Sequence, residues 1–314
     1  MNKTEKAQRA LMCVLKAGAY FGIYFACQLA LGLIIGLIFS FSAVLNGGSV
    51  DDSIEFITKY SLEITLISNI LAILGCTGLA FLFKRETRRV DELLDINLCY
   101  TPRAKMTACF LFMGIVGQFA VSVILSLIPF PESWLEMLNE NSDLIASGSF
   151  GMQVISVAIF APLAEEIVFR ACIQGSLQKG MPKWVAIILA SLIFGLMHGT
   201  PISIIYATSL GILMGWLYAK FNSIVPSLLF HFTFNFSSVI LATFEIAPLV
   251  LGLIALVCSM LFALCVVYIA ICGKSTVTNC EQQDTKKPNN DGFDSNGSNG
   301  DGSDSGSGDG FSVE

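Results

Sequence analysis

The stretch Phe160-Ala-Pro-Leu-Ala-Glu165-Glu166-Ile-Val-Phe-Arg170 places three charged side chains inside a long apolar run, 150–174. Such a run is typical of a helix that spans a membrane, for which about 20 apolar residues are needed. Ionisable side chains at the centre of such a helix cost about 2.5 to 3.5 kcal/mol each on insertion scales. Because proteins tolerate them where they pair with one another or line a watery cavity, the stretch predicts a membrane-embedded helix with a functional site inside it.

The spacing of the three charges separates them into a pair and a single acid. Glu166 and Arg170 lie four residues apart on one helix face and are predicted to form a structural ion pair. Glu165 points about 100° away from that face. Since a carboxylate without a helical partner is suited to general acid or base work, we expect Glu165 to do the chemistry. Pro162 cannot donate a backbone hydrogen bond, so we expect the helix to kink just before the acids and leave a polar gap.

Composition extends the membrane interpretation to most of the chain. Apolar residues make up 54 % of the sequence and charged residues 13 %, against about 25 % charged residues in soluble domains. We predict an all-α bundle of eight membrane-spanning helices. Seven remain the alternative, because the fifth and sixth segments are short. The predicted spans are 17–42, 62–83, 106–129, 150–174, 184–198, 202–219, 224–244 and 248–272.

Charges in the loops predict how the bundle lies in the membrane. Lysines and arginines gather before span one, between spans two and three, and after spans four, six and eight, whereas the alternate loops are acidic. The positive-inside rule then predicts a multi-pass protein of the plasma membrane with both termini in the cytoplasm. On this basis we divide the chain into N-terminal spans with their loops (1–149), a membrane core (150–275) and a disordered acidic tail (276–314).

The net charge of -6 comes from that tail. From Glu281 to Glu314 the chain has eight acids and two lysines. The rest of the protein is therefore close to neutral, and we expect no binding of nucleic acid.

Only two histidines occur, His198 and His231, and both lie in apolar segments. Phe194 precedes His198 by one helical turn and Asn235 follows His231 by one turn, so each pair shares a helix face. A lone histidine in an apolar helix is more often a packing residue. Two such histidines, with none in any loop, favour a functional role.

These three segments together resemble the family of CAAX-processing and bacteriocin-processing intramembrane proteases (CPBP, also called Abi). The motifs E-E-x-x-x-R, F-x-x-x-H and H-x-x-x-N stand here in order as Glu165-Glu166 with Arg170, Phe194 with His198, and His231 with Asn235. The resemblance covers about residues 150–240. It implies hydrolysis of a peptide bond within the lipid bilayer, with a peptide or membrane protein as substrate.

The resemblance also implies a role for each motif residue. Glu165 and His198 would hold and deprotonate the attacking water, and His231 and Asn235 would donate hydrogen bonds to the developing oxyanion. Glu166 and Arg170 would fix their helix in register. We expect the site to open toward the cytoplasmic half of the bundle.

Metal dependence and two other functions stay open. Glu165, His198 and His231 match the ligand set of a catalytic zinc, and would be the ligands of any bound metal. The motif H-E-x-x-H is absent, and the family's mechanism has also been interpreted as glutamate-driven, so we expect no tightly held zinc. The alternatives are a non-catalytic bacteriocin immunity or membrane scaffold protein, and a small transporter that uses Glu165 and His198 as a proton relay.

Overall fold

The computed structural model describes residues 2–45, 50–87, 104–244 and 248–273. Within these ranges the chain is helical and has no strands, which confirms the predicted all-α class. The chain forms two units, Met1–Val277 and Thr278–Glu314, and all described residues belong to the first. The predicted acidic tail, 276–314, lies outside the described residues, and the three-part division of the chain stays a prediction.

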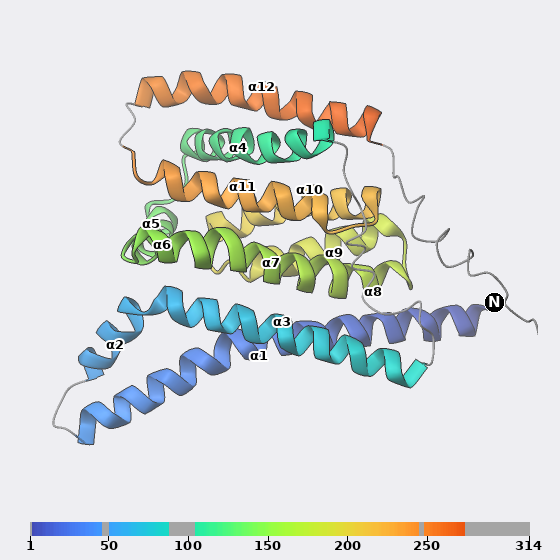
Figure 1. Cartoon of the computed structure of the whole chain (residues 1–314), viewed down its shortest axis with the longest axis horizontal. Coiled ribbons are helices and arrows are strands. Elements are labelled where there is room, and N and C mark those ends of the chain that lie inside the picture. Colours follow the sequence, from blue (N-terminus) through green and yellow to red (C-terminus); the bar gives the residue numbers. More distant parts are fainter. Residues whose placement is uncertain (1, 46–49, 88–103, 245–247, 274–314) are drawn as a thin grey trace, which may run out of the picture. The chain divides into compact units, whose positions relative to one another are not determined.

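The helices follow the apolar runs of the sequence (Figure 1). Their bounds are α1 Lys3–Leu45, α2 Val50–Lys59, α3 Ser61–Thr87, α4 Ala104–Leu127, α5 Glu132–Ala146, α6 Phe150–Gln153, the π-helix η2 Val154–Phe160, α7 Ala161–Glu165, the π-helix η3 Glu166–Gln174, α8 Gly175–Gln178, α9 Lys183–Leu196, α10 Pro201–Phe221, α11 Val225–Leu241 and α12 Pro248–Cys272. The elements from α6 to α8 follow one another without a break, so the charged stretch lies in one long helix.

Each of the eight predicted spans is helical, but two of the helices are short. In the part of the chain that the structure describes, six segments are long and apolar enough to cross a membrane: α1, α3, α4, α6 to α8, α10 and α12. The other two are α9 and α11. At about 1.5 Å per residue, the 14 residues of α9 extend about 21 Å, less than the ~30 Å hydrocarbon layer. We therefore expect the turn between α9 and α10, at Gly199 with its φ of 77°, to lie inside that layer.

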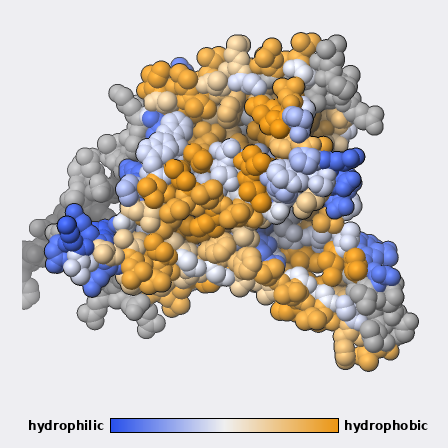
Figure 2. Space-filling view, turned by 180° about the vertical axis from the view of Figure 1, so that it is seen from behind, coloured by the Kyte–Doolittle hydropathy of each residue, from blue (hydrophilic) through white to orange (hydrophobic). Residues whose placement is uncertain are grey.

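The surface of the bundle fits a lipid environment. Figure 2 shows apolar side chains over most of its flank, with hydrophilic side chains gathered toward two opposite ends. Large apolar side chains such as Leu33, Leu37, Leu74 and Leu256 are more than half exposed. A continuous exposed apolar surface of this kind is expected where lipid, rather than water, is the neighbour.

One end of the bundle, which we name the basic end, gathers the helix termini that carry lysines. Gly180, just after α8, packs against Ala10 and Cys13 near the start of α1. Lys220 at the end of α10 donates from Nζ to the carbonyl oxygen of Ala270 in α12 at 3.2 Å. The lysines that lie here are Lys3, Lys6, Lys16, Lys105, Lys179, Lys183 and Lys220.

The opposite end, which we name the acidic end, holds two helices that the sequence did not predict, α2 and α5 (Figure 1). Ser156 of η2 donates from Oγ to the carbonyl oxygen of Leu62 at the start of α3, at 3.0 Å. The sequence prediction assigns both segments to acidic loops, because each is short and rich in Asp or Glu. They carry Asp51, Asp52, Glu55, Glu132, Glu136, Glu140 and Asp143.

Gly114 allows α4 to approach α11 closely, and its replacement tests how tightly these two helices pack. A Cβ atom at Gly114 in α4 would meet the side-chain oxygen of Thr233 and the carbonyl oxygen of Phe230 in α11. We expect Gly114→Ala to lower the free energy of unfolding by about 1 to 3 kcal/mol, as overpacking does elsewhere. Thermal unfolding in mild detergent measures the loss. The matched control is Gly78→Ala in α3, where no atom lies within 4 Å of the added carbon. Equal stability of the two variants would contradict the close packing of α4 on α11.

Candidate active site

The backbone before the two glutamates has the polar gap that Pro162 predicted. In η2 the N–H of Ala161 bonds to the carbonyl oxygen of Ser156, five residues earlier. The same pattern would pair the Val157 carbonyl with residue 162, which is proline and has no N–H. Asn235 of α11 fills this position instead, donating from Nδ2 to the Val157 carbonyl oxygen at 3.0 Å. The missing proton of Pro162 thus explains both the π-helix and the attachment of Asn235 to it.

The predicted ion pair between Glu166 and Arg170 is confirmed. Nε of Arg170 lies 3.5 Å from Oε2 of Glu166, and both side chains are 0 % exposed. The guanidinium carbon of Arg170 also lies 4.8 Å from the centre of the Phe194 ring, a cation–π contact. Since a buried charge needs a partner, each member of this pair keeps the other in place.

His231 lies between the two glutamates. Its Nδ1 is 3.1 Å from Oε1 of Glu166, and its Nε2 is 3.5 Å from Oε2 of Glu165. Glu165 has no partner in its own helix, as expected, but it receives one from α11. The imidazole of His231 thus connects the buried ion pair to the outer carboxylate.

The two adjacent carboxylates differ in how much of each side chain is exposed. The Glu165 side chain is 15 % exposed and lines a cavity, whereas that of Glu166 is 0 % exposed and lies behind it. A substrate or a water molecule in the cavity therefore meets Glu165 first. This agrees with the sequence prediction of which acid is available for chemistry.

His198 lies at the turn between α9 and α10 and lines the same cavity. Its Nδ1 is 2.9 Å from the carbonyl oxygen of Phe194. Because a carbonyl oxygen only accepts hydrogen bonds, Nδ1 carries the proton in this contact. In the neutral ring, Nε2 then has a free lone pair, which is what a base or a hydrogen-bond acceptor for water requires.

Phe194 holds the separate parts of the site together. Its ring centre lies 4.7 Å from that of His198 and 6.0 Å from that of His231, both edge to face. Its face carries the Arg170 guanidinium. Phe194 is almost completely buried, so one aromatic ring fixes the positions of two histidines and an arginine.

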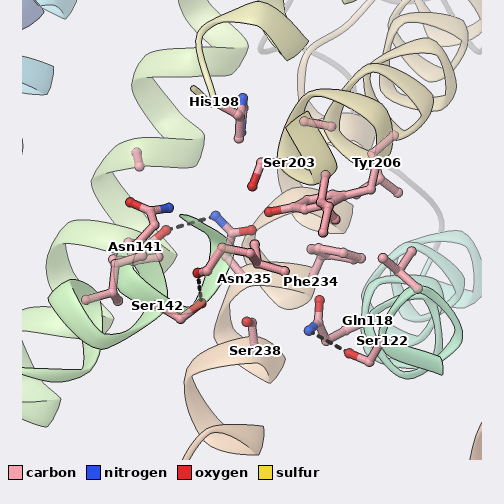
Figure 3. A pocket seen from close by; sticks show the side chains of 18 of the residues that line it. Gln118, Ser122, Asn141, Ser142, His198, Ser203, Tyr206, Phe234, Asn235 and Ser238 are labelled. Atoms are coloured by element: carbon pink, nitrogen blue, oxygen red, sulfur yellow. Dashed lines mark hydrogen bonds between the residues drawn. The ribbon is translucent and has the colours of Figure 1, made fainter. Parts of the chain in front are cut away.

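The cavity has a volume of about 680 Å³ and is lined by residues of α3, α4, α5, η2, α7, α9, α10 and α11. Figure 3 shows part of this lining from close by. Among the described residues that line it, Glu165 is the one acid, and no lysine or arginine is present. Its other polar side chains are hydroxyls, amides and the two histidines. The members that sequence reasoning missed include Gln118, Ser122, Ser126, Asn141, Ser142, Ser203, Tyr206 and Ser238.

Only part of this polar lining left a signal in the sequence. Gln118 and Ser122 lie one turn apart in an otherwise apolar span, and their side chains are hydrogen-bonded at 3.3 Å. That spacing could have indicated a polar stripe facing inward. Asn141 and Ser142 gave no such signal, because α5 itself was not predicted.

The position of the cavity corrects one expectation. Its lining runs from Glu165 and His231 to the first turns of α3 and the last turns of α4, and ends beneath α5. It therefore opens at the acidic end, not at the basic end that the sequence prediction assigned to the cytoplasm. The loop charges specify only the orientation of the helices, whereas packing decides which half of the bundle is hollow.

The three candidate metal ligands do not form a metal site in this arrangement. Glu165 and His231 are close, and His198 bonds through Nδ1 to the carbonyl oxygen of Phe194, which leaves Nε2 as its available ligand atom. Among the described residues, no group of three or more His, Cys, Asp or Glu side chains is arranged to hold a metal ion. Elemental analysis of the purified protein tests its metal content directly.

The fold and the site together define a multi-pass helical membrane protein with a buried glutamate–histidine–arginine cluster facing an intramembrane cavity. Residues 147–237 match the family model described as "Type II CAAX prenyl endopeptidase Rce1-like". This match confirms the resemblance stated from the three motifs, and it covers the segment in which all seven motif residues lie.

Two curated proteins are similar to part of the chain. One is "UPF0177 protein YxdF" of Lactococcus lactis, 30 % identical over 95 residues, which are 30 % of this chain and 52 % of that protein. The other is "Putative membrane peptidase YdiL" of Bacillus subtilis, 30 % identical over 84 residues, which are 27 % of this chain and 34 % of that protein. The matched segments thus span about half and a third of these relatives. No solved structure matches the chain significantly.

Proposed function

We propose that this protein is an intramembrane endopeptidase that hydrolyses a peptide bond with a water molecule activated by Glu165 and His198. The observation that carries the proposal is the pair of bases on the cavity wall: the accessible carboxylate of Glu165 and the free Nε2 of His198. The family match and the word "peptidase" in the name of one relative support the same reaction class.

In the proposed reaction, Glu165 takes a proton from water while the oxygen attacks the carbonyl carbon of the substrate. His198 accepts a hydrogen bond from the same water and directs its lone pair toward that carbon. The resulting tetrahedral intermediate collapses when Glu165 returns the proton to the leaving nitrogen. The products are a carboxylic acid and an amine, and transfer of the acid proton to the amine gives a carboxylate and an ammonium group. The enzyme regains its starting state and no further reactant is consumed.

Two donors from α11 are proposed to stabilise the oxyanion. His231 has Nε2 at the cavity wall, held by the carboxylates on either side of its ring. Asn235 has two N–H groups on Nδ2, of which one is used on the Val157 carbonyl. The second is available for a substrate oxygen, and its fixed attachment to η2 means that little reorganisation is needed.

Replacing Asn235 tests this assignment. We expect Asn235→Ala to lower kcat by about 10²- to 10³-fold with little change in KM, as loss of one oxyanion donor does elsewhere. The matched control is Ser238→Ala, one turn further along α11 on the same cavity wall. Steady-state kinetics on one peptide substrate compares the two. An Asn235→Ala variant that is folded and as fast as the control would remove Asn235 from the mechanism.

The function itself is tested by incubating the purified protein in lipid nanodiscs with a diverse peptide library and mapping the products by mass spectrometry. Discrete cleavage that is lost in Glu165→Gln is the expected result. If no peptide is cut across a broad library, or if both proteins cut alike, the peptidase proposal fails. A binding role in the same cavity, as in an immunity or scaffold protein, would then explain the site better.

A further inference from the structure

We infer that the substrate reaches the site from the extracytoplasmic side of the membrane, beneath α5, as a neutral or basic polypeptide segment. This inference rests on the proposed function and adds to it the side of entry and the charge of the substrate. Three features of the bundle carry it: a closed basic half, a loosely covered acidic end, and a mouth without cations.

The basic half of the bundle is closed by packed side chains. Between the cavity and the basic end lie large residues that are almost completely buried: Phe110, Phe169, Ile173, Leu217, Phe221 and Phe230. The rings of Phe110 and Phe221 meet edge to face, with their centres 5.4 Å apart. A peptide could reach Glu165 from this end only by disrupting the core, which is packed as densely as a crystal.

The acidic end is covered by one amphipathic helix. Helix α9 is short and ends at the turn that carries His198, and α5 contacts α10 and lines the same cavity. Leu135, Leu138 and Ile145 of α5 line the cavity, yet no residue of α5 is buried. A cover that contributes no residue to the core moves at lower free-energy cost than the packed helices around it. We therefore expect α5 to be the element that moves when a peptide enters.

The loop charges predict on which side of the membrane the acidic end lies. The lysines cluster at the basic end, which the positive-inside rule places in the cytoplasm. The acids of α2 and α5 gather at the other end. The mouth of the cavity consequently faces the extracytoplasmic side, and the substrate is a segment exposed there.

The charge of the substrate follows from the lining. The acids of α5 are Glu132, Glu136, Glu140 and Asp143, which fall on the helix face opposite to the residues that line the cavity. Inside, Glu165 meets no lysine or arginine among the described lining residues. A substrate carboxylate near the scissile bond would add a second negative charge in a medium of low dielectric constant. Neutral or basic segments avoid this repulsion.

Thiol labelling tests the side of entry without any turnover. Ser142→Cys places a thiol on α5 at the cavity mouth, and Thr4→Cys places one at the basic end; both positions are exposed. A membrane-impermeant maleimide is applied to right-side-out and inverted vesicles, with the wild-type chain as the blank for its native cysteines. Ser142→Cys is expected to label only in right-side-out vesicles and Thr4→Cys only in inverted ones. Labelling of Ser142→Cys only in inverted vesicles, or in neither, overturns the inference.

Cleavage in the same vesicles tests the substrate. The probe is a water-soluble quenched-fluorescent peptide with the sequence selected from the library, made with Ala, Lys or Glu two residues from the scissile bond. We expect the initial rate to be about tenfold or more higher in right-side-out than in inverted vesicles, since a charged peptide crosses a bilayer poorly. We expect kcat/KM for the Glu peptide to be about tenfold below that of the Ala peptide.

The two experiments separate failure of the inference from failure of the proposed function. Faster cleavage in inverted vesicles, or a preference for the Glu peptide, overturns the inference while the peptidase stands. Outside labelling of Ser142→Cys with no cleavage even after permeabilisation removes the peptidase, and the extracytoplasmic mouth remains.

Discussion

Glu165→Gln is expected to lower kcat for peptide cleavage by about 10³-fold, within the range of 10² to 10⁴ that general-base catalysis contributes. The amide keeps the shape of the side chain and its contact with His231, but it cannot take the proton from water. Binding is affected little, so KM should change less than kcat. Single-turnover kinetics on one fluorogenic peptide, in nanodiscs, measures the effect on the chemical step alone.

The matched control for Glu165→Gln is Glu140→Gln on the outer face of α5. It makes the same chemical change on an exposed side chain outside the cavity, and its kcat should stay within about twofold of wild type, as for most surface substitutions. A Glu165→Gln variant that is folded and as active as Glu140→Gln would show that another group activates the water. His198 would then be the remaining base on the wall.

Arg170→Met is expected to lower the free energy of unfolding by about 3 to 5 kcal/mol, the usual result of removing one partner of a buried ion pair. Methionine replaces much of the volume of arginine but leaves Glu166, which is 0 % exposed, with only the neutral Ser227 hydroxyl and His231 as described partners. It also removes the cation from the Phe194 face. Unfolding in mixed micelles of a mild and a denaturing detergent gives the free energy.

Two further variants show whether the loss comes from the unpaired charge. Glu166→Gln combined with Arg170→Met removes both charges and should recover most of the stability, because neutral pairs of similar volume are often as stable as buried ion pairs. Arg9→Met in the exposed start of α1 is the control for loss of an arginine and should change stability by less than about 0.5 kcal/mol. If the double variant is as unstable as Arg170→Met, the lost stability comes from poorer packing and not from the unpaired charge.

The inner and outer members of the charged cluster have different roles. The cluster runs from Arg170 through Glu166 and His231 to Glu165. The inner pair is shielded from solvent and neutralises its own charges, while the outer carboxylate faces the cavity. His231 touches both acids, so a change at the buried pair moves the imidazole that borders the cavity. Arg170 and Glu166 are thus positioning residues, and their replacement should affect catalysis through His231 rather than through the substrate.

What the sequence determined by itself is local. The length of the apolar runs predicted all eight helical segments, since a run of that length has few other stable forms in a bilayer. The four-residue spacing of Glu166 and Arg170 predicted their ion pair, because residues one turn apart are neighbours in any helix. Pro162 predicted the interruption before the acids for the same local reason, its missing N–H.

Only the tertiary structure decided how these helices meet. A helix that is apolar on all faces has no face that the sequence marks as inward, since lipid and neighbouring helices are equally apolar. The contact of His231 with both glutamates, the donation from Asn235 to Val157 and the polar lining at Gln118 therefore could not be read from spacing. The opening of the cavity at the acidic end is of the same kind: it depends on which half of the bundle large side chains fill, and that follows from long-range packing.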